Sequence, residues 1–212
     1  MLDVERPPLP VPEVLAPLLP DGLRRGSVAA VLGSTSLLLA LLAPASQRGS
    51  WVVVLGQPTF GALAAAEAGL TLSRVGVVTD PGADAALVLA ALLDGVDVVV
   101  VGPAVRLTDA DRHRIAARAR ERGTVLIPTS PWDGASTVLT VTDRRWAGIG
   151  PGSGRLKEQH LVVARTGRGR HAGAAVELTL TLPLSGSGEV ATAPAATASD
   201  VPTQGRRLHL AG

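Results

Sequence analysis

Short apolar segments that suit β-strands alternate with helical segments between residues 28 and 127 of this chain. Parallel strands need long crossover connections, usually helices, so this order predicts an α/β domain whose mostly parallel central sheet is flanked by helices. The valine-rich segment 96–101 is typical of a strand buried on both faces, and we expect it to be central. The predicted strands span residues 28–32, 51–55, 75–79, 96–101 and 124–127, and the predicted helices span residues 36–43, 60–68, 83–93 and 109–122.

The pattern changes after residue 136 to short pieces that favour antiparallel strands, joined by the Gly-rich segment 148–154 and the basic segment 165–170. These pieces span residues 138–142, 161–165 and 176–182. We therefore expect a β meander that extends the sheet. Residues 1–20 form a Pro-rich N-terminal segment, and the Ser-, Gly-, Ala-, Thr- and Pro-rich residues 183–212 are predicted to be a disordered tail. One folded domain is expected over residues 21–182.

Composition narrows the possible chemistry. The chain has no cysteine, and its four histidines lack metal-ligand spacing, so we expect neither disulfides nor a metal site. The N-terminus does not resemble a signal peptide and the longest apolar run is interrupted, which favours a cytoplasmic protein without a membrane segment. Only four residues are aromatic. We expect Trp51 in the core, whereas Trp132 and Trp146 fit either the core or a partner interface.

Positive charge gathers in residues 106–170, where thirteen basic residues face six acidic ones, a balance of +7. A basic surface for nucleic acid or an acidic partner is one interpretation. Solvated arginines on a helix and a hairpin are the other. The helix after Thr108 has acidic residues in its first turn and arginines toward its end, which the helix dipole favours without any binding function.

The first predicted strand leads into a position typical of a phosphate-binding loop. Such a loop has the pattern G-x-x-x-x-G-K-[S/T], because several backbone N–H groups and one ammonium must surround the phosphates. Here only Ser34 and Thr35 separate Gly33 from Ser36, and the single lysine of the chain, Lys157, lies far downstream. The sequence therefore predicts a nucleotide-binding scaffold that has lost its nucleotide.

Four stretches, taken in order, resemble the RecA recombinase core over about residues 12–182. They are the turn 22–26 before the first strand, the strand 96–101 at the Walker B position, residues 138–145 with the Gly-rich turn after them, and residues 159–165 with their basic successor. The resemblance implies a RecA-like core extended by C-terminal antiparallel strands.

The resemblance also implies that the catalytic positions of the family are lost. The Walker A lysine has no counterpart after Gly33, the Walker B aspartate falls on Gly102, and the water-activating glutamate falls on Pro58. These three losses predict a protein that is not an enzyme and needs no cofactor. The segments that would correspond to DNA-binding loops, residues 102–107 and 128–136, are short, so filament formation on DNA is not expected.

Among RecA-like proteins, the chain resembles the actinobacterial ImuA-type proteins of the SOS response. The loop Trp132-Asp133-Gly134 and residues 143–155 support this likeness, together with the loop at Gly33 and the end of strand 96–101. It implies an accessory protein of translesion synthesis that binds the ImuB polymerase-like protein, an error-prone DnaE-type polymerase, or both, with weaker contact to DNA. The candidate binding residues are Arg144, Arg145, Trp146, Arg155, Lys157, Arg168, Arg170, Arg206, Arg207, Leu208 and Leu210.

Two alternatives remain open. A cell-division inhibitor that resembles SulA would combine the same fold with a tubulin-like division protein as its partner. Residual nucleotide binding would use Gly33, Ser34, Thr35 and Ser36, with Asp80 or Asp97 as a metal contact. Both aspartates also suit structural roles, in a turn and at a strand start.

Overall fold

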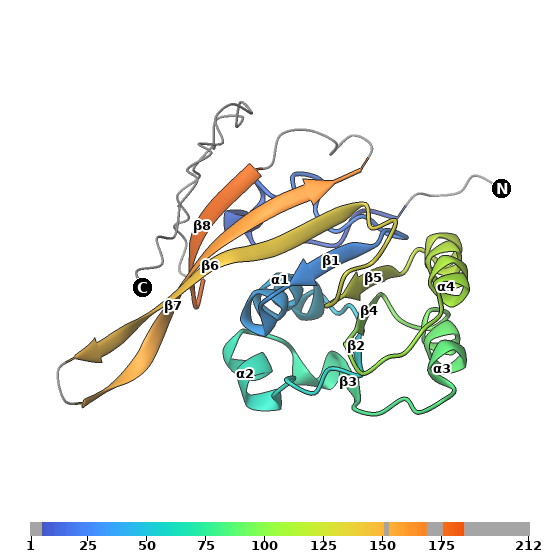
Figure 1. Cartoon of the computed structure of the whole chain (residues 1–212), viewed down its shortest axis with the longest axis horizontal. Coiled ribbons are helices and arrows are strands. Elements are labelled where there is room, and N and C mark those ends of the chain that lie inside the picture. Colours follow the sequence, from blue (N-terminus) through green and yellow to red (C-terminus); the bar gives the residue numbers. More distant parts are fainter. Residues whose placement is uncertain (1–5, 151–152, 169–175, 185–212) are drawn as a thin grey trace, which may run out of the picture.

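The computed structural model describes residues 6–150, 153–168 and 176–184, and Figure 1 shows their arrangement. The strands are β1 (Ala29–Leu32), β2 (Val52–Leu55), β3 (Val75–Val78), β4 (Val98–Val101), β5 (Val125–Pro128), β6 (Thr137–Gly150), β7 (Ser153–Gly167) and β8 (Val176–Leu182). The α-helices are α1 (Thr35–Gln47), α2 (Ala62–Glu67), α3 (Ala85–Leu92) and α4 (Asp109–Arg122), and the short 3-10 helices are η1 (Glu13–Leu15) and η2 (Leu72–Arg74).

The strands form a parallel sheet and a mixed sheet. The parallel sheet has the order β3-β2-β4-β5, and the mixed sheet has the order β1-β6-β7-β8, in which β1 and β6 are parallel and the later pairs are antiparallel. A parallel bridge between Val28 and Leu126 joins the two sheets, and the Leu126 amide donates to the Ser27 carbonyl at 3.0 Å. The predicted α/β class is confirmed, as are the parallel strands and the antiparallel extension.

Valine-rich strands account for the burial of the parallel sheet. Strand β4 lies between β2 and β5, and its four valines are buried, as predicted for a central strand. Helices α1 and α2 lie on one side of the sheet, and α3 and α4 lie on the other (Figure 1). Alternate residues of β4 belong to two core clusters, with Val98 and Val100 in one and Val99 and Val101 in the other.

The folded unit includes part of the Pro-rich segment that precedes residue 21. Leu9 forms a bridge with Leu23, and Leu15 and Leu18 are fully buried in the same cluster as helix α1. The leucines between the prolines therefore contribute to the core, because their side chains pack into this cluster rather than remaining in solvent.

Helix α1 extends four residues beyond its predicted end at Ala43. Its N-cap Ser34 accepts a hydrogen bond from the Leu37 amide at 3.1 Å, and the helix continues through Pro44 to Gln47. Proline removes one backbone donor from a helix. Here the buried Ala45 and Ser46 hold the last turn against the core.

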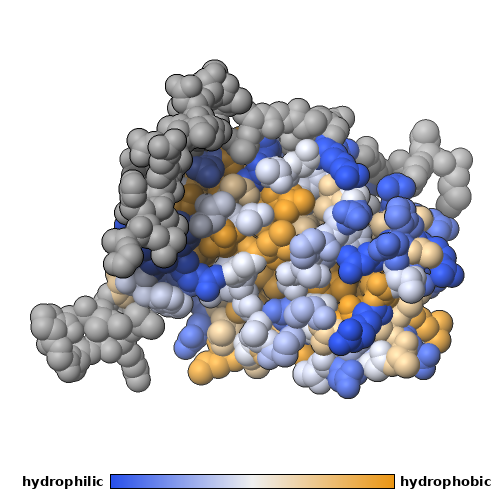
Figure 2. Space-filling view, in the orientation of Figure 1, coloured by the Kyte–Doolittle hydropathy of each residue, from blue (hydrophilic) through white to orange (hydrophobic). Residues whose placement is uncertain are grey.

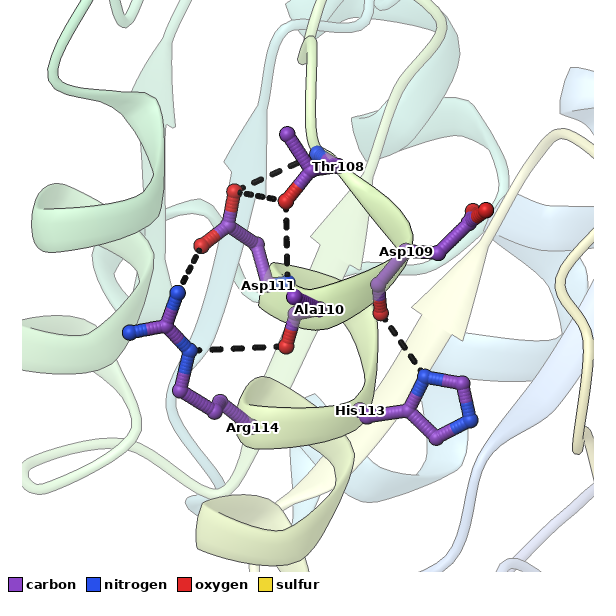
Figure 3. Close-up of polar contacts among 6 residues, drawn as sticks. All are labelled: Thr108, Asp109, Ala110, Asp111, His113 and Arg114. Atoms are coloured by element: carbon purple, nitrogen blue, oxygen red, sulfur yellow. Dashed lines mark hydrogen bonds and ion pairs between the residues drawn. The ribbon is translucent and has the colours of Figure 1, made fainter.

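Helix α4 begins at a capping box, shown in Figure 3. The Thr108 hydroxyl accepts from the Asp111 amide at 3.2 Å, and an Asp111 carboxylate oxygen accepts from the Thr108 amide at 3.2 Å. The Thr108 hydroxyl also donates to that carboxylate, and these hydrogen bonds hold the pKa of Asp111 below its usual range. The helix ends at Gly123, whose φ of 71° is left-handed, as favoured at a helix C-terminus.

Two of the antiparallel strands, β6 and β7, are much longer than predicted, whereas β8 has the predicted bounds. Strand β6 reaches Gly150 and β7 begins at Ser153, within the Gly-rich segment that we expected to be a linker, and register shifts follow Val141 and Ala147. Glycine has little strand propensity, so the sequence pattern ended the strands too early. Figure 1 shows the β6–β7 hairpin extending beyond the rest of the molecule.

The tryptophans occupy different environments. Trp51 is 43% exposed, contrary to our expectation of a core residue, and the Arg74 guanidinium lies over its ring at 5.1 Å. Trp132 is buried, with Arg112 over its ring at 5.0 Å, whereas Trp146 is 52% exposed. Within the described residues, none of the helices is long and apolar enough to cross a bilayer.

Candidate functional site

A hollow of about 350 Å³ lies at the carboxyl ends of the parallel strands. The loop Gly33–Ser36 between β1 and α1 forms one wall, and Gln57 and Thr129, which follow β2 and β5, form another. Its remaining lining residues are Val31, Pro103, Arg144, Trp146 and Gln159. The predicted residues Gly33 to Ser36, Arg144 and Trp146 are therefore brought together at one site.

Hydroxyl and amide groups connect the walls of this hollow. The Thr129 hydroxyl donates to Gln57 Oε1 at 2.8 Å, and Gln57 Nε2 donates to the Thr59 hydroxyl at 2.6 Å. The Thr59 and Thr35 hydroxyls are 3.0 Å apart. This chain of hydrogen bonds between uncharged groups ties the ends of β5 and β2 to the start of α1.

An arginine from the hairpin lies against the loop. The Arg144 guanidinium donates to the Gly33 carbonyl, and the Ser34 hydroxyl is already engaged as the cap of α1. The first N–H groups of a helix have no intrahelical partner and carry partial positive charge. Together with Arg144, they make this end of the hollow electropositive.

Gly102, which aligns with the Walker B aspartate in the RecA-like resemblance, occupies a position that admits no side chain. A Cβ atom there would overlap the backbone of Gly56 and approach the Gln57 nitrogen to 2.5 Å. The Gly102 amide donates to the Leu55 carbonyl at 2.7 Å, which fixes this close approach of the two strand ends. Pro58 is exposed and does not line the hollow. Among the described lining residues there is no carboxylate.

The two aspartates considered as metal contacts lie elsewhere. Asp97 lies just before β4, at the opposite end of the strands from Gly33. There its carboxylate accepts from Arg25 at 2.8 Å and from the Trp51 amide at 2.9 Å. Asp80 follows the outermost strand β3 and accepts from the Gly82 amide at 2.9 Å. Four strand spacings, roughly 19 Å, separate β3 from β1. The proposed metal contact by either residue is therefore wrong, since both have structural roles away from Gly33. No group of three His, Asp or Glu side chains suited to a metal occurs in the described part of the chain.

The candidate basic residues do not form one surface. Arg145 pairs with Asp143 at 3.1 Å, and Arg168 lines a separate hollow of about 400 Å³ with Arg24, Arg25 and Arg120. That hollow lies at the start of β1, opposite the Gly33 end. The Arg168 amide donates to the Ser136 carbonyl at 3.1 Å. Arg155 and Lys157 belong to β7, but their side chains are outside the description. Arg170, Arg206, Arg207, Leu208 and Leu210 lie outside the described residues.

Most arginines of helix α4 have local partners. Arg118 and Arg122 bind Asp94 at 2.5 and 3.0 Å, and Arg114 binds Asp111 at 2.9 Å. The hydrogen bond from Arg118 holds the pKa of Asp94 below its usual range. Hydrophilic side chains cover the α4 side of the view in Figure 2. Pairing on this helix thus accounts for three of the thirteen basic residues of the segment 106–170.

Sequence reasoning missed the three uncharged polar residues of the lining that lie outside the loop at Gly33. Gln57 and Thr129 directly follow buried strands, and a polar residue at that place was a usable indication. Gln159 is 4% exposed and stands on the buried face of β7 with Leu161 and Val163. Its Oε1 atom is buried without a hydrogen-bond partner in the described residues. A glutamine among alternating apolar residues was the available sign.

The comparison with known families concerns the half of the chain that builds the parallel sheet. Residues 17–134, more than half of the chain, match the model of the MT3502 N-terminal domain. The chain belongs to the MT3502 N-terminal domain family. It is 39% identical over 165 residues to the uncharacterized protein Rv3395c of Mycobacterium tuberculosis, an alignment that covers 74% of this chain and 80% of that protein. The match to the MT3502 N-terminal domain includes Gly33, Gln57 and Thr129, whereas Arg144 and Gln159 follow it.

Proposed function

We propose that this chain is a RecA-like, non-enzymatic scaffold of damage-induced mutagenesis. In this proposal it acts in the cytoplasm and binds an ImuB-type polymerase-like protein, an error-prone DnaE-type polymerase, or both. The RecA-like resemblance and its ImuA-type features motivate the choice of partners.

The packing around Gly102 is the observation that most supports a role without catalysis. Phosphoryl transfer in RecA-like enzymes depends on a carboxylate that positions the metal ion at the end of the fourth strand. Here the backbone of Gly56 occupies the volume that any side chain at position 102 would need. An acidic residue at this position would require the ends of β2 and β4 to separate.

The hollow beside Gly33 supports the same conclusion. Its described lining consists of hydroxyls, amides, small or apolar groups, Trp146 and one guanidinium, a set suited to binding rather than to acid–base chemistry. Arg144 reaches the Gly33 carbonyl, where a nucleotide phosphate would otherwise approach the loop. The name of the MT3502 N-terminal domain family states no activity.

The exposed hairpin supports a role in protein binding. Trp146 is 52% exposed beside Arg144 and Arg145, and tryptophan and arginine are enriched among residues that dominate binding energy at interfaces. A rigid parallel sheet carrying an exposed hairpin of this composition suits a scaffold.

Mutation frequency after DNA damage tests the proposal in the host organism. A strain without the gene should show fewer damage-induced mutations, and the wild-type gene should restore them. An unchanged mutation frequency, together with filamentous cells on overexpression, would contradict the proposal and favour the SulA-like alternative.

A further inference from the structure

Two neighbouring hollows meet at the start of helix α1. The polar hollow beside Gly33 and a second, larger one of about 660 Å³ share the lining residues Ser36, Trp146 and Gln159. The second hollow, here called the apolar groove, runs between α1, α2 and the end of β8. Because these three residues line both, the two hollows adjoin, and together they are here called the channel, with a polar end and an apolar end.

The apolar groove is shaped by small side chains. Ala40 and Ala43 of α1 face Ala64 and Ala68 of α2 across it, and Leu182 closes one side. Small residues leave room for a bulky apolar side chain from a ligand. Gln47 at the end of α1 and Glu67 at the end of α2 also line the groove, whereas Arg144 lies at the start of α1.

Gln159 lies where the two hollows join. It is the direct cross-strand neighbour of Trp146, so the two side chains share one face of the hairpin. Its Oε1 atom is buried and lacks a hydrogen-bond partner among the described residues. A buried unpaired acceptor is costly, so a ligand in the channel would gain a hydrogen bond once the Gln159 side chain turns its Oε1 atom toward it.

We propose that this channel binds an extended acidic–apolar peptide segment of a protein partner. The peptide's Asp or Glu carboxylate is held by Arg144 and the N-terminus of α1, its backbone N–H donates to Gln159 Oε1, and a neighbouring bulky apolar side chain enters the groove. This inference rests on the proposed binding function and specifies the kind of segment that the partner presents.

Charge fixes the direction of the peptide. Arg144 and the free N–H groups of α1 lie at the polar end, so the carboxylate belongs there. Glu67 lies along the groove and disfavours a second acidic residue at the apolar end. The exposed ring of Trp146 spans both parts and covers the peptide between them.

Selection from a phage library of random dodecapeptides on the full-length protein tests the inference without assuming a partner. The selected peptides are then synthesised and measured by fluorescence polarisation against the wild type, Gln159→Leu and Arg144→Glu. Leucine has a volume close to that of glutamine and removes only the amide, so the groove keeps its shape. Arg106→Glu is the matched control, because it makes the same charge reversal at an exposed arginine that lines neither hollow.

We expect the selected peptides to share a carboxylate near a bulky apolar residue. Their affinity should fall by about tenfold or more in Gln159→Leu and Arg144→Glu, and should change by less than about threefold in Arg106→Glu. Should Gln159→Leu fail to fold, Trp146→Ser replaces it, since that side chain is exposed. Peptides without this pattern, or equal binding to wild type and Gln159→Leu, overturn the inference.

Two further outcomes separate this inference from the proposed function and from another occupant. Peptide binding as expected, with mutation frequency independent of the gene, contradicts the mutagenesis role and supports the channel. Normal damage-induced mutagenesis in the Gln159→Leu strain contradicts the channel and leaves the scaffold role intact. A synthetic peptide of residues 185–212 that displaces the selected peptides would assign the channel to the chain's own C-terminal segment and overturn the partner assignment.

Discussion

The β2–β4 pair and the β6–β7 hairpin differ in what surrounds their residues. The valines of β2 and β4 are buried on both faces, and the strand ends approach so closely at Gly56 and Gly102 that no side chain fits between them. In the hairpin, Arg144, Arg145 and Trp146 are exposed in consecutive positions. The first region stabilises the fold, whereas the second offers side chains for binding at little cost to stability.

The largest effect on stability is expected from an acid introduced into the β2–β4 pair. Gly102→Asp should lower the free energy of unfolding by about 3 kcal/mol or more, because its side chain overlaps the Gly56 backbone. Urea unfolding measures the change. Gly95→Asp is the control, since a Cβ atom there meets nothing within 4 Å. Equal stability of both variants would show that the strand ends separate easily.

A smaller effect on stability is expected at the other end of β4. Asp97→Ala removes the acceptor for Arg25 and for the Trp51 amide, and should cost about 2 kcal/mol. The matched change Asp80→Ala removes one exposed turn contact and should cost less than about 1 kcal/mol. If Asp80→Ala is the more destabilising of the two in thermal unfolding, the structural role given to Asp97 is wrong.

The capping box of α4 has an intermediate contribution. Thr108→Ala should destabilise the fold by about 1 kcal/mol, because the Asp111 amide loses its acceptor. Thr108→Ser keeps the hydroxyl and should stay close to the wild type. Chemical denaturation of the three proteins compares them directly, and identical midpoints would argue against the cap.

Acid should weaken the contacts of α4. The pKa values of Asp94 and Asp111 are lowered in the folded state, so their stabilisation is fully present above the unfolded-state pKa of about 3.9 and is lost as pH falls through the folded values. The melting temperature should therefore fall as the pH is lowered below about 4. Asp94→Asn should show a shallower fall over that interval, and a slope equal to that of the wild type would contradict the role of this ion pair.

The smallest effect on stability is expected in the hairpin. Arg145→Glu and Trp146→Ala should each change the free energy of unfolding by less than about 1 kcal/mol, since both side chains are exposed. Calorimetry can test this directly. A loss comparable to that of Gly102→Asp would remove the distinction between the two regions.

The parallel sheet could be predicted from the sequence because strands buried on both faces are short apolar runs separated by helices. The cap at Thr108 could be predicted for a similar local reason. The length of the hairpin could not, because the glycines near residue 150 favour a loop until strand pairing overrides them. The close approach at Gly102 depends on the register of β2 and β4, which lie far apart in sequence. Trp51 is exposed and its ring contacts Arg74, a residue far along the chain, which no local pattern indicates.

We propose above that the chain binds a mutagenic polymerase assembly through its hairpin. Affinity capture of the tagged wild type and of Trp146→Ala from the same DNA-damaged host, with mass spectrometry of the bound proteins, tests it most directly. We expect the wild type to retain the ImuB-type protein or the DnaE-type polymerase and Trp146→Ala to retain much less. Recovery of neither polymerase protein by the wild type, or equal recovery by both proteins, would contradict it.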